Sequence, residues 1–217
     1  MPDLQFRIVG VEPAARGLTP LLHFQLEIRN SPATESIHSV MLQAQIQIQS
    51  PQRTYDAGEK EKLEDLFGAP DRWGQTLRNR LWTHANTCIR TFSGKTRASL
   101  PVACTYDLNV SATKYFYALE GGEVPLLFLF SGTIFYAGEA GHLQVQQIPW
   151  DRECTYTMPV REWQGLMDYH YPGTAWLSLH REIFDRLYAY RRRHGLATWD
   201  QAIEQLLPAA QSVEAAS

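Results

Sequence analysis

Apolar and polar side chains alternate without interruption between Val40 and Gln49, and this feature constrains the fold most. A period of two held over ten residues predicts a β-strand that buries one face and exposes the other, which is lined with glutamines. One solvated face is typical of antiparallel sheets. Residues 22–29 alternate in the same way, and the turn-type residues 30–34 separate the two segments. We therefore expect consecutive antiparallel strands, as at the start of a β-sandwich.

The middle of the chain continues this pattern. Further strand-like segments lie at residues 81–92, 98–108, 124–136 and 143–147. A short helix is expected at residues 57–67, because three apolar residues are spaced i, i+3, i+4 and Gly68 follows them. Residues 112–119 fit either a helix or a strand. The sequence therefore predicts a mainly β (α+β) fold: a two-sheet antiparallel immunoglobulin-like β-sandwich with a short inserted helix and a C-terminal helical segment.

Helical periodicity replaces strand periodicity towards the C-terminus. Helices are expected at residues 160–167, 182–194 and 199–207. Gly195 directly follows a basic last turn, and Pro208 follows the final helix, so both helix ends are marked. The chain has 217 residues, of which 44% are apolar, which is enough for one core. We expect one domain over residues 1–208, with a helical part at 159–207, and a disordered tail at 209–217.

The apolar runs, the first residues and the cysteines of the sequence predict its cellular compartment. No apolar run approaches the roughly 18–20 residues that cross a bilayer, so we expect no membrane insertion. The first residues, MPDLQF, lack the basic and apolar regions of a secretory signal. Cys88, Cys104 and Cys154 are an odd number of cysteines. Reduced thiols and a cytoplasmic location are therefore expected.

The same cysteines are candidate ligands for a metal ion. His84 and Cys88 share one face and, with the two other cysteines, supply four soft ligands. The cysteines are scattered and include no C-x₂-C pair, so ordinary packing is favoured over a metal site. No G-x-S-x-G, G-x-G-x-x-G or P-loop pattern occurs. We predict no catalytic residue, no metal and no cofactor.

The C-terminal region allows two interpretations. Residues 175–207 resemble a monomer of the ribbon-helix-helix repressors, a family in which strands paired across a dimer read the DNA major groove. Residues 181–194 hold five arginines against two acids. The resemblance implies a DNA-binding regulator. A helical hairpin packed on the sandwich is favoured instead, because Trp176 suits base reading poorly and the whole chain carries a net charge of −3. Nucleic-acid binding is thus expected to be absent.

The assembled segments also resemble a known family. The resemblance is carried by residues 37–46, 66–68, 72–77, 100–108, 125–133, 148–151 and 195–200. They are similar to an uncharacterised bacterial family, of about this chain's length, that bears a domain-of-unknown-function label. Its members are often encoded beside genes for uptake nickel–iron hydrogenases and their maturation proteins. The resemblance implies a link to hydrogenase assembly and supplies no catalytic residues.

Together these observations predict a non-catalytic accessory or scaffold protein that binds another protein, which the resemblance suggests is a hydrogenase subunit or maturation factor. Aromatic residues make up 12% of the chain and anchor interfaces as well as cores. Loops on a rigid scaffold often carry recognition. The candidate partner-binding residues are Phe67, Trp73, Tyr169, His170, Tyr171, Arg191, Arg192 and Arg193. The three arginines are also expected to stabilise the negative end of the helix at 182–194.

Overall fold

The computed structural model describes residues 1–14, 17–105, 110–138 and 141–214, and the side chains of these residues up to Leu207. The chain divides into two compact units, Met1–Thr174 and Ala175–Ser217, which are the sandwich unit and the helical unit below. Each is described by itself. The expectation of one domain over residues 1–208 remains a prediction.

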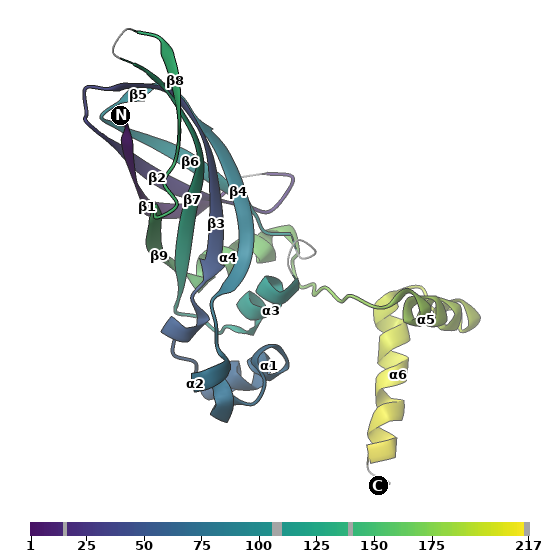
Figure 1. The fold of residues 1–217 in the computed structure, drawn as a ribbon. Coiled ribbons are helices and arrows are strands. Elements are labelled where there is room, and N and C mark those ends of the chain that lie inside the picture. Colours follow the sequence, from purple (N-terminus) through teal and green to yellow (C-terminus); the bar gives the residue numbers. More distant parts are fainter. Residues whose placement is uncertain (15–16, 106–109, 139–140, 215–217) are drawn as a thin grey trace. The chain divides into compact units, whose positions relative to one another are not determined.

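The sandwich unit contains two antiparallel sheets (Figure 1). The three-stranded sheet has the order β1 (Asp3–Pro13), β2 (Leu21–Ser31), β6 (Lys95–Ala103). The larger sheet has the order β4 (Arg80–Ile89), β3 (Ser36–Ile48), β7 (Glu123–Ala137), β8 (Leu143–Gln147), with β5 (Phe92–Ser93) on β3 and β9 (Glu153–Pro159) on β7. The mainly β, two-sheet antiparallel prediction is confirmed.

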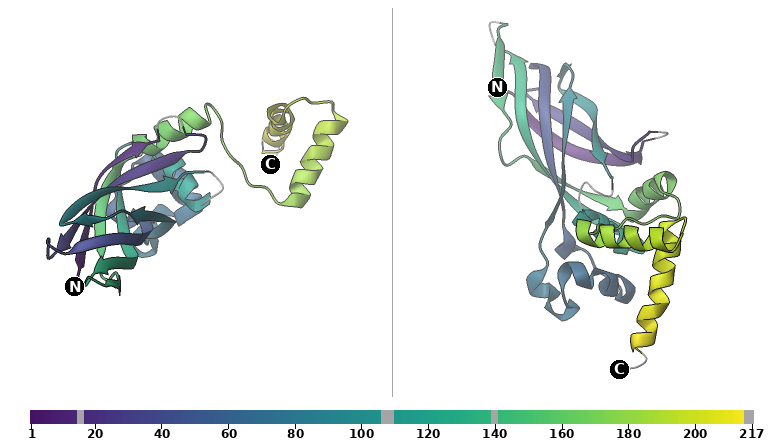
Figure 2. Two further views of the ribbon diagram at one scale, coloured as in Figure 1. Left: turned by 90° about the horizontal axis from the view of Figure 1, so that it is seen from above. Right: turned by 90° about the vertical axis from the view of Figure 1, so that its right-hand side faces the viewer.

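Alternating side chains of the two sheets meet in one core. In β3, every second residue from Val40 to Ile48 is buried, as the ten-residue alternation predicts. The Phe6 ring of β1 stacks on Phe130 of β7 with centroids 4.5 Å apart. Phe24 of β2 meets Phe128 edge-on. Figure 2 shows the two sheets lying face to face around this core.

Four α-helices lie in the described part of the sandwich unit: α1 (Ala57–Phe67), α2 (Trp73–Thr76), α3 (Val110–Ala118) and α4 (Val160–His170). Short 3₁₀ turns at Ser50–Gln52 and Pro70–Arg72 flank α1. The bounds of α1 match the prediction, and Asp56 caps it by accepting from the Glu59 amide at 2.8 Å. The ambiguous segment at 112–119 is helical, because Tyr115 and Phe116 both reach the core from α3. Residues 106–108 of the predicted strand and 139–140 of the predicted hairpin lie outside the described residues.

The helical unit consists of α5 (Arg181–Arg193) and α6 (Trp199–Glu214). Gly195 has φ +64°, which glycine adopts readily, and ends α5 as predicted. The α6 backbone continues past Pro208 to Glu214, whereas the sequence predicts an end at Leu207. The alanines that follow Pro208 favour a helix. This preference offsets the loss of the hydrogen bond that proline, which has no amide N–H, cannot donate. Residues 175–180, which have a strand pattern, form no strand.

Candidate functional site

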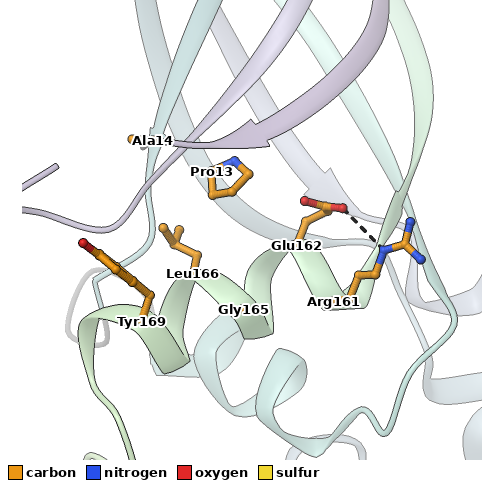
Figure 3. Close-up of a pocket in the computed structure, with 7 residues that line it drawn as sticks. All are labelled: Pro13, Ala14, Arg161, Glu162, Gly165, Leu166 and Tyr169. Atoms are coloured by element: carbon orange, nitrogen blue, oxygen red, sulfur yellow. Dashed lines mark ion pairs between the residues drawn. The ribbon is translucent and has the colours of Figure 1, made fainter. Parts of the chain in front are cut away.

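A groove lies between the end of β1 and one side of α4 (Figure 3). The helix begins directly after Pro159, and its inner side packs on the core through Val160, Trp163 and Met167. Another side of the helix, which carries the buried Leu166, faces the residues that end β1. The groove has a volume of about 600 Å³ and is lined by Pro13, Ala14, Arg161, Glu162, Gly165, Leu166 and Tyr169.

Apolar and polar parts of this groove are separated. Gly165 leaves its middle open, because a Cβ added there would meet no atom within 4 Å. At one end the Arg161 Nε lies 3.5 Å from the Glu162 Oε1. The Tyr169 ring stands at the other end, as Figure 3 shows. Such a lining suits an apolar group held between polar ends better than acid–base chemistry.

The three predicted contact residues at 169–171 gather at the C-terminal end of α4. Tyr169 and His170 are the last helical residues, and not part of a turn as the sequence predicts. The Tyr169 ring lies 5.2 Å from the His170 ring. His170 Nε2 is buried and has no hydrogen-bond partner among the described residues. Tyr171 packs against the core. Tyr169 is therefore the residue of this group that lines the groove.

Phe67 and Trp73 lie in a second cluster, beside α1. Their rings are 5.3 Å apart, at nearly a right angle. Trp73 is only 6% exposed, and its indole Nε1 donates to the Gly68 carbonyl at 2.7 Å. The Arg80 guanidinium lies over the Phe67 ring at 4.8 Å. These side chains hold the inserted segment in place, and little of Trp73 is accessible to a partner.

Sequence reasoning missed a buried ion pair at the base of the same insertion. Arg53 Nη2 lies 2.5 Å from Glu59 Oε1, and both side chains are almost fully buried. Arg53 also donates to the carbonyls of Gly121 and Glu123 at 2.8 and 2.9 Å. The spacing Asp56-x-x-Glu59 signals a capping box and points to Glu59. Nothing in the sequence marks Arg53, which is 6 residues away from Glu59.

A pair of tyrosines is buried beside this ion pair. The hydroxyl groups of Tyr55 and Tyr115 lie 3.0 Å apart, and Tyr55 also donates to the Ser50 carbonyl at 3.0 Å. Burial raises the pKa of both phenols above the ordinary value. Neutral phenols in a hydrogen-bonded pair stabilise the packing of the insertion and are not primed for proton transfer at neutral pH.

The helical unit exposes most of its apolar side chains. Of its described side chains, only Ala202 is buried. The exposed apolar set is Trp176, Leu177, Leu179, Ile183, Phe184, Tyr188, Ile203, Leu206 and Leu207. A groove of about 500 Å³ runs along α5, with Ile183, Leu187, Tyr190 and Leu206 among its lining residues and Arg186 and Arg193 also lining it. This amphipathic surface is called the helical-unit face below.

The three predicted arginines end α5 but have different surroundings. The Arg191 guanidinium lies 4.1 Å from the centre of the Trp199 ring and 5.4 Å from that of Tyr188. It therefore ties α5 to the start of α6 through cation–π contacts. Arg192 is exposed, and Arg193 lines the groove of the helical-unit face. Their position in the last turn also suits the helix dipole.

The cysteines occupy three different environments. Cys88 is exposed on β4. Burial raises the pKa of Cys104 to about 12 and that of the half-buried Cys154 to about 11. Among the described residues, no group of three His, Cys, Asp or Glu side chains is placed to hold a metal ion. In the same part of the chain, no helix combines the length and the apolar character needed to cross a membrane.

Comparison with protein-family models gives a match to nearly the whole chain. A model described as a family of unknown function (DUF6084) matches residues 1–215. No curated protein matches the chain significantly. Among solved structures, the chain is similar to the solution structure of a putative late embryogenesis abundant protein. That likeness has 10% sequence identity and a TM-score of 0.32, and it covers 73% of this chain and 71% of the other.

Proposed function

The chain belongs to the DUF6084 family, and we propose that it is a non-catalytic accessory protein that binds another protein through its helical unit. One observation carries this proposal: the helical-unit face leaves nine large apolar side chains exposed in a unit of about 40 residues. Isolated units of this size rarely hold a core of their own. Exposed apolar side chains in this number, some of which line one groove, are typical of an interaction site.

The composition of the face supports a protein partner. Aromatic residues and arginine are enriched at the centres of protein interfaces, and both occur on this face in Phe184, Tyr188 and Arg193. Covering one half-exposed side chain contributes roughly 1 kcal/mol. The sandwich unit would then serve as a rigid carrier. Within this proposal the protein acts in the cytoplasm, and the partner is a nickel–iron hydrogenase subunit or maturation factor, as the family resemblance implies.

Copurification from the native host tests the proposal. A tagged wild-type chain is compared with the double variant Ile183→Glu, Leu206→Glu, whose new carboxylates lie in the groove of the helical-unit face. Met41→Glu, at an exposed β3 position, is the matched control. Burying a carboxylate is costly, so the double variant should capture at least about tenfold less partner, and the control should capture as much as wild type. Equal capture by all three chains would contradict the proposal.

A second candidate function is a DNA-binding regulator, and one observation favours it. Residues 175–180 have a strand pattern but form no strand within the helical unit, as expected of a segment that would pair with the same segment of a second copy. A gel-shift measurement with the chain's own promoter separates the candidates. The accessory proposal predicts no shift. A shift at nanomolar protein that is lost when Arg191, Arg192 and Arg193 are replaced by alanine, and that weakens steeply with salt, would favour the regulator.

A further inference from the structure

The strand β8 presents its apolar side chains to solvent instead of to the core. Its neighbour is β7, and Gln144 stands opposite Tyr136 while Val145 stands opposite Phe135. Opposed residues of an antiparallel pair project from the same face. Gln144 therefore shares the inner face with the buried Tyr136, and their side chains hydrogen-bond at 3.0 Å. Leu143 and Val145 lie on the outer face and are 62% and 58% exposed.

The same strand has an open backbone edge. Gly138 N donates to His142 O, and Ile148 N donates to Gly132 O, both at 2.9 Å. Because bonded and non-bonded pairs alternate in an antiparallel ladder, the even-numbered residues of β8 bond to β7. Leu143, Val145 and Gln147 thus direct their N–H and C=O groups away from β7. Figure 1 shows β8 at the outer edge of its sheet, and no described backbone group pairs with these three residues.

This edge also lacks the features that normally prevent strand addition. Natural edge strands are protected by charges, prolines or bulges. Residues 141–148 contain no Asp, Glu, Lys, Arg or Pro. An uncharged edge has no like-charge repulsion against a second copy of itself. A second copy of β8 offers the same outward backbone groups and the same exposed Leu143 and Val145, so it matches this edge both in hydrogen bonding and in apolar surface.

We propose that β8 pairs antiparallel with β8 of a second copy of the chain, about a two-fold axis that passes beside Val145. In this register Val145 stands opposite its own counterpart, and Leu143 stands opposite Gln147. Leu143, Val145 and Gln147 of the two copies then form six backbone hydrogen bonds with one another. The two six-stranded sheets join into one continuous sheet. The two Leu143 and two Val145 side chains meet on the outer face, where they cover one another. The contact is isologous and closed.

Site-specific disulfide formation tests the register. In a Cys88→Ser background, which removes the exposed native thiol, Val145→Cys is compared with Gln146→Cys. Facing residues of a hydrogen-bonded pair have Cα atoms about 5.5 Å apart, within disulfide range. In this register the two copies of residue 146 do not stand opposite each other, and their Cα atoms lie farther apart than the roughly 7 Å limit for a disulfide. With oxidised glutathione as the oxidant, Val145→Cys should form a covalent dimer on a non-reducing gel, at least about tenfold more than Gln146→Cys.

A second measurement tests self-association of the chain without forming a disulfide. Val145→Lys places like charges opposite one another at the proposed axis. Sedimentation of the full chain should show at least about tenfold weaker self-association than wild type, with an unchanged circular dichroism spectrum. Absent or equal cross-linking at residues 145 and 146, or self-association unchanged by Val145→Lys, would overturn the proposal. None of these results depends on the helical-unit face.

Discussion

The buried Arg53–Glu59 pair allows a stability prediction of stated size. Replacement of Glu59 by glutamine removes the negative charge that faces the guanidinium at 2.5 Å. Glutamine also occupies the N3 position of a capping box, but Glu59 accepts hydrogen bonds through both of its oxygens, so the change removes the charge together with one acceptor. The Arg53 guanidinium would keep the Gly121 and Glu123 carbonyls as acceptors but would have no counter-charge. Breaking a buried pair in this way costs about 3–5 kcal/mol.

That cost is large against the about 5–15 kcal/mol by which a domain is stable. Urea unfolding, followed through the buried Trp73 and Trp82, measures it as a change in the free energy of unfolding. The double variant Arg53→Met, Glu59→Gln should recover at least half of the loss, because no unpaired charge remains. We expect a lower urea midpoint for Glu59→Gln alone, with a partial return in the double variant.

The exposed pair of Lys62 with Glu120, with nitrogen and oxygen 2.8 Å apart, is the matched control. Both of its side chains are about half exposed, so Lys62→Met should leave the urea midpoint close to that of wild type. A cost for Glu59→Gln as small as that of the control, or a double variant no more stable than Glu59→Gln alone, would refute the reasoning.

Three further predictions concern single residues. Gly132→Ala should lower stability by at least about 3 kcal/mol in urea unfolding, since φ is +134° and the added Cβ would collide with the Met41 carbonyl oxygen of β3; wild-type stability would contradict this. The pKa of Cys104 is about 12 in the fold against an ordinary 9.0, so above pH 9 the unfolded chain loses a proton that the folded chain keeps. Stability should therefore fall by up to about 1.4 kcal/mol per pH unit between these values, and Cys104→Ala should remove that part of the slope. Arg191→Ala should cost about 1 kcal/mol of helix stability by thermal circular dichroism, because it removes the stacking on Trp199, whereas Arg192→Ala should cost clearly less.

The periodic parts of the fold were predictable from the sequence. The alternation in β3 gives its buried face, and the apolar edge and Gly68 of α1 give that helix with its observed bounds. These features depend on nearest neighbours along the chain. The segment at 112–119 was ambiguous, because its pattern fits two periods and only tertiary packing of α3 selects one.

The parts that were missed depend on contacts between distant residues. Arg53 finds Glu59 and the carbonyls at 121 and 123 only after the chain has folded. The outward position of Leu143 and Val145 depends on the register of β8 with β7, and a shift of one residue would reverse it. The role of Trp73 as a contact residue stays a prediction, but the hydrogen bond of its indole inside the insertion was not predictable from its place in a loop. Loop position alone does not give side-chain exposure.

The central claim is that the chain works bound to a different protein, and the mass of its complex tests that claim most directly. The chain alone has a mass of 24.8 kDa. Native mass spectrometry of a chain purified gently from its native host should give a species that contains a second protein, in fixed proportion to this chain. That species should disappear in the Ile183→Glu, Leu206→Glu variant. Only masses of 24.8 kDa and its whole multiples, in wild type and variant alike, would contradict the account.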